Sequence, residues 1–138
     1  VAPLAVALSA MANKILFLSS WGMGLVTLLA VLSFTHNLNR TLLTLYASGI
    51  VTSIWNHGTT TEVAKYTDRA TMWVGCGVDL VYIAKLSGLA QALCSACVAA
   101  AVACYVLSKR CSSEEARLAC HVSSHVFVTA LHNAQLYL

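Results

Sequence analysis

The feature that most constrains this chain is its succession of long apolar segments, which are separated by short polar loops. Charged residues make up only 9% of the sequence and hydrophobic residues 59%, whereas soluble globular domains carry about 25% charged residues. So few charged side chains cannot cover a molecule of this size in water. Because a membrane-spanning helix needs about 20 apolar residues, the 138 residues allow about five spans. The predicted fold class is therefore an all-α integral membrane helical bundle.

The apolar segments predict a single transmembrane domain, 1–138, in which residues 1–12 are too short to span alone. The approximate spans are 15–34, 41–56, 68–83, 89–107 and 116–138. The fourth segment is rich in Ala, Cys and Ser, small residues that let membrane helices approach closely. The run from Ser112 to Glu115 resembles a helix start and precedes the last span. The cysteines lie mostly inside apolar segments, where thiols pack as small apolar residues.

The basic residues divide unequally between the two sides of this five-span arrangement. Arg40 and Lys85 fall on one side. The other side carries Lys14, Lys65, Arg69, Lys109, Arg110 and Arg117. The positive-inside rule therefore places the N-terminus inside. The net charge of +3 is spread over several loops and forms no basic patch, which argues against a nucleic-acid partner. The expected partners are the lipid bilayer, a bound lipid and other membrane subunits.

Polar residues with metal-binding and catalytic chemistry fall at the inner ends of three predicted spans. Ser53 and His57 lie four residues apart at the end of the second span, and His121 and His125 have the same spacing near the start of the last. Asp68 begins the third span. Residues four apart share a helix face, and ionisable groups inside a membrane nearly always face the bundle interior with a partner. We therefore expect these five side chains to meet at one depth.

The histidines predict a zinc site. A His-x-x-x-His spacing presents two imidazoles to one metal, so His57, His121 and His125 are the predicted ligands. Three histidines leave a fourth position for a water molecule, whose pKa then falls to about 7. Asp68 would orient or deprotonate that water, and Ser53 would donate a hydrogen bond to the developing oxyanion. Simpler interpretations are that His57 is a polar end group and that Asp68 is a helix N-cap.

A second polar pair is predicted deeper in the bundle. Asp79 lies eleven residues after Asp68, and His132 lies eleven after His121, which is about three helical turns. The two side chains are thus expected to form a buried pair near the middle of the membrane. We favour a structural hydrogen bond that satisfies both groups, and the alternative is a proton relay towards the metal. His36, in the first loop, falls on the opposite side and is not expected to join the metal site.

Taken together, these motifs resemble the CREST superfamily of membrane hydrolases, which includes the alkaline ceramidases, the progestin and adiponectin receptors and the haemolysin III-like proteins. The matching pattern is Ser53-x-x-x-His57, Asp68 eleven residues later, and His121-x-x-x-His125 in the last span. The spacing to Asp68 and the run from Asp68 to Trp73 are most similar to the alkaline ceramidases. The resemblance covers spans two, three and last. It implies a seven-helix fold, zinc held by three histidines, and hydrolysis of lipid amides such as ceramide.

The chain departs from that family pattern in two respects. It has room for about five spans, so the resemblance is to a shortened form that lacks a helix pair before the last span. Residues 1–52 contain no Asp or Glu, so the acidic segment with which alkaline ceramidases bind calcium has no counterpart.

The function predicted from the sequence is a CREST-like zinc hydrolase of a lipid amide or ester. One alternative is a non-catalytic accessory subunit of a larger membrane complex, for example a respiratory one, that retains a structural zinc or a relic site. A third is a haem-binding membrane subunit, with His57 and His125 as paired ligands. The family resemblance implies the endoplasmic reticulum or Golgi, and the accessory role a mitochondrial or plastid membrane.

Overall fold

The computed structural model describes residues 2–34 and 38–138, with side chains described from residue 13 onwards. Within these residues the chain forms five α-helices and no strand, which confirms the all-helical prediction. The helices are α1 (Ala2–Ser33), α2 (Arg40–Gly58), α3 (Glu62–Ile83), α4 (Gly88–Arg110) and α5 (Glu114–Gln135). His36 lies outside the described residues.

The helices begin earlier than the predicted spans. The difference that affects a functional residue most is in α3, which starts at Glu62. Thr61 caps this helix, because its side chain accepts a hydrogen bond from the Ala64 N–H at 3.3 Å. Asp68 therefore lies inside the helix, and its interpretation as an N-cap is wrong. At α5 the predicted start is confirmed, since the Ser113 side chain accepts a hydrogen bond from the Ala116 N–H at 3.1 Å.

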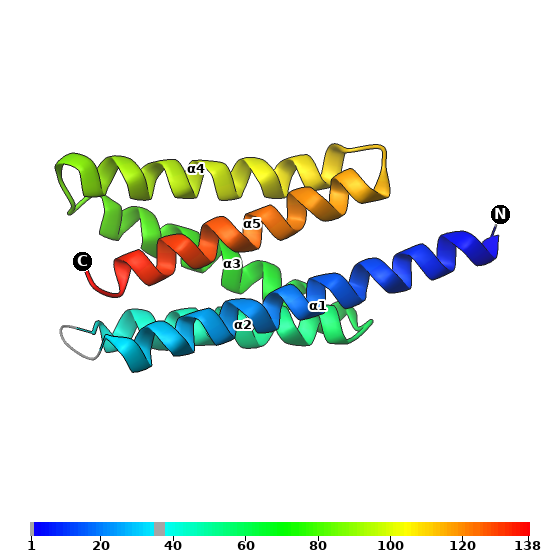
Figure 1. The fold of residues 1–138 in the computed structure, drawn as a ribbon, viewed down its shortest axis with the longest axis horizontal. Helices are drawn as coiled ribbons and strands as arrows, with labels where there is room; N and C mark the ends of the chain where they lie inside the picture. The colour runs from blue at the N-terminus through cyan, green and yellow to red at the C-terminus, as the bar shows by residue number, and fades with distance from the viewer. Residues whose placement is uncertain (1, 35–37) are drawn as a thin grey trace.

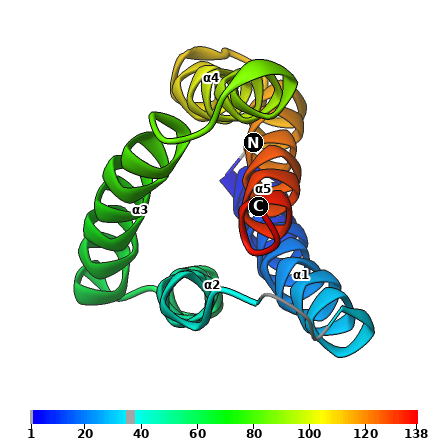
Figure 2. The same ribbon diagram turned by 90° about the vertical axis from the view of Figure 1, so that its left-hand side faces the viewer.

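The five helices run side by side along the long axis of the molecule (Figure 1) and surround an interior when seen end-on (Figure 2). α4 packs along α5, α1 contacts α2 and α5, and α2 contacts α3, whereas α3 and α4 touch less extensively. Gly58, at the end of α2, lies against Phe17 of α1. A Cβ at this position would come within 3.0 Å of the Phe17 ring, so glycine lets this end of α2 approach α1.

The packed core lies towards one end of the bundle. Leu42, Tyr46 and Leu136 form one buried cluster, and Ile83, Cys94 and Leu131 form another. These residues come from the start of α2 and α4 and from the end of α3 and α5. At the opposite end, where α2 ends and α5 begins, the helices enclose a cavity instead.

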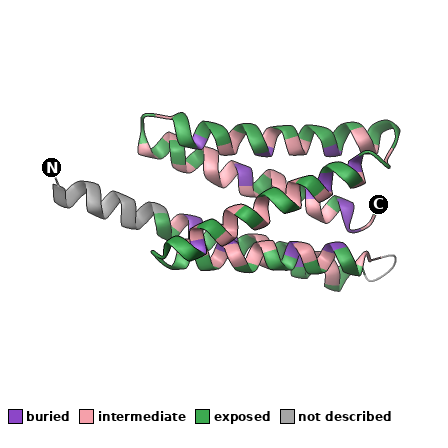
Figure 3. Cartoon of the chain, turned by 180° about the vertical axis from the view of Figure 1, so that it is seen from behind, coloured by how far each residue is buried: buried purple, intermediate pink, exposed green. Residues whose placement is uncertain are grey.

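Two helical segments of the described chain, Asn13–Ser33 and Gly88–Arg110, are long and apolar enough to cross a membrane. The other three helices have 19, 22 and 22 residues, enough to cross about 30 Å at about 1.5 Å per residue. They are more polar because they carry the residues that line the cavity. Figure 3 shows that the outer faces are largely exposed, and large apolar side chains occupy them, for example Leu32, Val63 and Leu89.

Candidate metal centre

Three histidine side chains converge where α2 ends and α5 begins. His57 lies in the last turn of α2, and His121 and His125 lie on successive turns of α5. One ring nitrogen from each histidine lies within 4.8 Å of those of the other two. The ring centroids are 5.1, 5.2 and 5.7 Å apart. Tetrahedral Zn–N bonds of about 2.0–2.1 Å place ligand nitrogens about 3.4 Å apart, so small side-chain rotations would complete such a site.

The environment of His57 fits a metal ligand. Its Nε2 atom is buried and has no hydrogen-bond partner among the described residues. An unpaired polar atom of this kind costs about 1–3 kcal/mol. Coordination of a metal ion would use the lone pair of Nε2, so the residues present suit a bound cation.

Ser19 of α1 orients His125. Its Oγ donates a hydrogen bond to the Leu16 carbonyl oxygen at 2.8 Å and lies 2.8 Å from His125 Nδ1. When His125 binds a metal through Nε2, its Nδ1 carries the proton, and Ser19 can accept a hydrogen bond from Nδ1–H while its own proton goes to the carbonyl. Contacts of this kind fix the tautomer of metal-binding histidines. Sequence reasoning missed Ser19, although a pair of adjacent hydroxyls inside an apolar segment was a usable signal.

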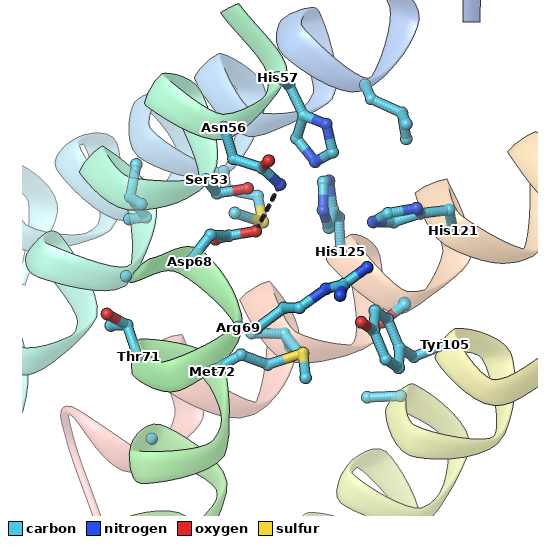
Figure 4. Close-up of a pocket in the computed structure, with 18 of the residues that line it drawn as sticks. Ser53, Asn56, His57, Asp68, Arg69, Thr71, Met72, Tyr105, His121 and His125 are labelled. Atoms are coloured by element: carbon cyan, nitrogen blue, oxygen red, sulfur yellow. Dashed lines mark hydrogen bonds between the residues drawn. The ribbon is translucent and has the colours of Figure 1, made fainter. Parts of the chain in front are cut away.

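Asp68 faces the same cavity from α3. Its Oδ2 accepts a hydrogen bond from Asn56 Nδ2 at 2.7 Å, and Figure 4 shows the two side chains turned towards each other beside Ser53. Since Asn56 directly precedes His57, the end of α2 both supplies a histidine and holds the carboxylate. Asn56 was not predicted, because a lone amide at the end of an apolar segment is ordinary.

Ser53 is buried, with 5% of its surface exposed. It shares a hydrogen bond of 3.0 Å with Ser20 Oγ, which itself donates to the Leu16 carbonyl oxygen at 3.0 Å. Either hydroxyl can be the donor in this pair. The predicted role of Ser53 as a donor to an oxyanion requires its hydroxyl to turn from Ser20 towards the cavity.

The cavity has a volume of about 440 Å³, within the range of ligand-binding pockets. All five residues predicted for the metal site line it: Ser53, His57, Asp68, His121 and His125. Much of the remaining wall is apolar, with contributions from Leu16, Met23, Ile50, Met72, Val98, Val102, Val128 and Leu131. The cavity extends past this wall to Tyr46 and His132.

Basic side chains also gather at this cavity. Lys65 and Arg69, one turn apart on α3, line it together with Lys109 of α4. Lys109 Nζ lies 4.9 Å from the centroid of the Tyr105 ring, which stands 5.9 Å from the His121 ring. The structure thus brings Lys109 to the same cavity as Lys65 and Arg69.

The structure places Asp79 and His132 in contact near the packed end of the bundle. His132 Nε2 lies 3.2 Å from Asp79 Oδ2, and Tyr46 Oη donates a hydrogen bond to Asp79 Oδ1 at 3.2 Å. Tyr46 also contacts Gln135 Oε1 and stacks on the His132 ring, with centroids 3.6 Å apart. Asp79 is 4% exposed and bonded at both oxygens, which supports a structural role. Sequence spacing gave no signal for Tyr46 or Gln135.

We compared the chain with known proteins. No family model matches the sequence, and neither a curated protein nor a solved structure matches it. The resemblance to the CREST superfamily accordingly rests on its motif residues alone.

Proposed function

We propose that this chain is an integral membrane protein that binds Zn²⁺ through His57, His121 and His125 and hydrolyses an amide or ester bond of a lipid. The observation that carries this proposal is the convergence of three ring nitrogens within 4.8 Å, one of them buried and unpaired among the described residues. The same cavity contains Asp68. Three imidazoles with an open fourth position are a common catalytic zinc site.

The outer surface supports integration into a membrane. Large apolar side chains are exposed on α1, α2, α3, α4 and α5, and in water such a surface would aggregate. We infer that all five helices span the bilayer and that the polar residues of α2, α3 and α5 face the cavity. The CREST resemblance favours the endoplasmic reticulum or Golgi as the location.

Bound at the three imidazoles, Zn²⁺ would supply Lewis-acid chemistry. The remaining tasks fall to the chain itself. Ser19 would accept a hydrogen bond from His125 Nδ1–H when Nε2 binds the metal, and Asn56 holds the carboxylate of Asp68. In this proposal Asp68 would take a proton from the attacking water, and Ser53, once its hydroxyl turns, would donate a hydrogen bond to the carbonyl oxygen. The apolar walls suit an acyl chain and exclude bulk water.

The geometry favours a small ion over haem. A haem iron has two axial positions for protein ligands, whereas three imidazoles converge here. Absence of Soret absorbance in the purified protein is the expected result.

The test is metal content per chain in detergent-purified protein. We expect about one zinc in the wild type and none in His121→Ala. His132→Gln is the matched control, because His132 lies on the same helix but contacts Asp79 instead of the cluster, and it should keep its zinc. A folded wild type without metal would overturn the proposal, and zinc without hydrolysis of ceramides or other lipid amides and esters would favour the accessory-subunit alternative.

A further inference from the structure

The cavity beside the histidines contains more basic than acidic side chains. Its cations are Lys65, Arg69 and Lys109, and its carboxylates are Glu62 and Asp68. Glu62 pairs with Lys65 at 2.9 Å, so these two charges offset each other. Among the described residues, neither Arg69 nor Lys109 has a carboxylate within ion-pair distance. Asp68 is close enough to interact electrostatically with both of them, but it carries one charge, so one positive charge among the described residues that line the cavity is not offset.

These two cations approach the histidine cluster from different helices. Arg69 follows Asp68 on α3, and Figure 4 shows its side chain extending into the pocket in the direction of Tyr105 and His125. Lys109, in the last turn of α4, stands over the Tyr105 ring at 4.9 Å. The two positive groups are close enough to interact electrostatically with each other. Both cations thus line the same cavity as the predicted metal ligands.

Membrane topology alone does not explain this placement. The positive-inside rule requires basic residues on one side of the membrane, but not basic side chains that line a cavity. Arg110, next to Lys109, meets the rule without lining the cavity. Gathering like charges is unfavourable unless an anion offsets the repulsion, and guanidinium and ammonium groups both bind phosphate, sulfate and carboxylate oxygens strongly.

We propose that the cavity takes a lipid with a negatively charged oxyanion head group, which Arg69 and Lys109 bind beside the histidine cluster while the acyl chain lies along the apolar wall. This proposal rests on the proposed function, because the amide or ester bond that is hydrolysed is the one proposed there. It adds the class of lipid that carries this bond. The preferred lipid is anionic, in contrast to neutral ceramide.

The experiment measures binding by the full chain in a non-ionic detergent. The probes are a fluorescent monoacylglycerol and the same molecule with a terminal phosphate, and the measured quantity is the ratio of their dissociation constants. In the wild type we expect the phosphate form to bind at least about tenfold more tightly, which corresponds to about 1.4 kcal/mol, because hydrogen bonds between charged partners are stronger than neutral ones. Arg69→Gln and Lys109→Gln should each bring the ratio towards one.

Arg110→Gln is the matched control, because it removes the same charge from the neighbouring position without altering the cavity lining. Its ratio should equal that of the wild type. An equal decrease in Arg110→Gln would overturn the inference, because the selectivity would then come from the general surface charge. Displacement of the phosphorylated probe by an equimolar amount of inorganic phosphate would overturn the assignment to a lipid.

The His121→Ala variant separates this inference from the proposed function. The charge preference depends on α3 and α4, so His121→Ala should retain a preference for the phosphorylated probe that Arg69→Gln abolishes. Zinc and hydrolysis without any charge preference would leave the proposed function standing and reject the anionic substrate. A charge preference that depends on Arg69 in a protein without zinc would support the binding site and reject the hydrolase.

Discussion

At the residue scale, one serine and one asparagine decide how the candidate metal site is held. Ser19 shares a hydrogen bond with His125 Nδ1, and Asn56 donates one to Asp68. Each contact fixes a group that would otherwise rotate. The first directs the lone pair of His125 towards the other imidazoles, and the second orients the only carboxylate at the centre of the predicted chemistry.

Ser19→Ala should weaken zinc binding about 10–100-fold, which is typical when the partner of a metal-binding histidine is removed. The measurement is competition for zinc with a chelator of known affinity. Ser48→Ala is the matched control, because Ser48 also donates to a carbonyl three residues earlier but is exposed and touches no histidine. Wild-type affinity in Ser19→Ala would show that Ser19 does not orient the ligand.

Asp68→Asn should retain zinc and the folded state while hydrolysis falls about 10²–10⁴-fold, the usual contribution of a general base. An amide can keep a hydrogen bond with Asn56 but cannot accept the proton of the attacking water. Turnover is measured on a lipid amide and metal content on the same sample. Activity near the wild-type level would assign the proton transfer to another group.

At the scale of the elements, a polar network joins α2, α3 and α5 near the packed end of the bundle. Tyr46 and His132 both bond Asp79, and their rings stack. Three helices that carry few charged residues are thereby tied in one register. That register brings the other ends of α2, α3 and α5 together, where the histidines and Asp68 lie.

Asp79→Asn should lower the free energy of unfolding by about 0.5–2 kcal/mol, the range for hydrogen bonds between membrane helices, and leave zinc content unchanged. Unfolding is followed in increasing denaturing detergent. Asp68→Asn provides the comparison, because it is the same substitution on the same helix. It is expected to lower hydrolysis without lowering the free energy of unfolding. Unchanged stability together with an altered pH dependence of hydrolysis would instead favour the proton-relay alternative.

At the scale of the whole molecule, the main question is how many helices cross the membrane. α1 and α4 contain segments that meet the criteria of length and apolar composition, whereas α2, α3 and α5 carry the cavity residues. If all five helices cross, successive loops alternate between the two sides. If only the two apolar helices cross, the loops on either side of α3 lie on the same side.

Single cysteines introduced by Thr60→Cys and Ser87→Cys into a chain without its native cysteines should react with an impermeant maleimide from opposite sides of sealed vesicles. Both positions are exposed, one in the α2–α3 loop and the other at the start of α4. The positive-inside rule places Thr60 inside. Reaction of both from one side would contradict the five-span arrangement and leave two spans.

The sequence by itself determined the helical class and the approximate positions of the helices, because apolar periodicity and length act within each segment. It also indicated which polar residues share a depth, since a fixed rise per residue relates Asp68 to Asp79 and His121 to His132. The predicted span 68–83 begins later than α3, because Thr61 caps the helix within the polar stretch that precedes this span.

Only the tertiary structure showed which side chains of α1 and α4 reach the site. Ser19 reaches His125 from a segment 106 residues away, and Arg69 and Lys109 face one cavity from two different helices. No spacing within a segment encodes such contacts, because they depend on the rotation of each helix about its axis. Packing at the far end sets that rotation, where Tyr46 and Asp79 hold α2 and α3 in place.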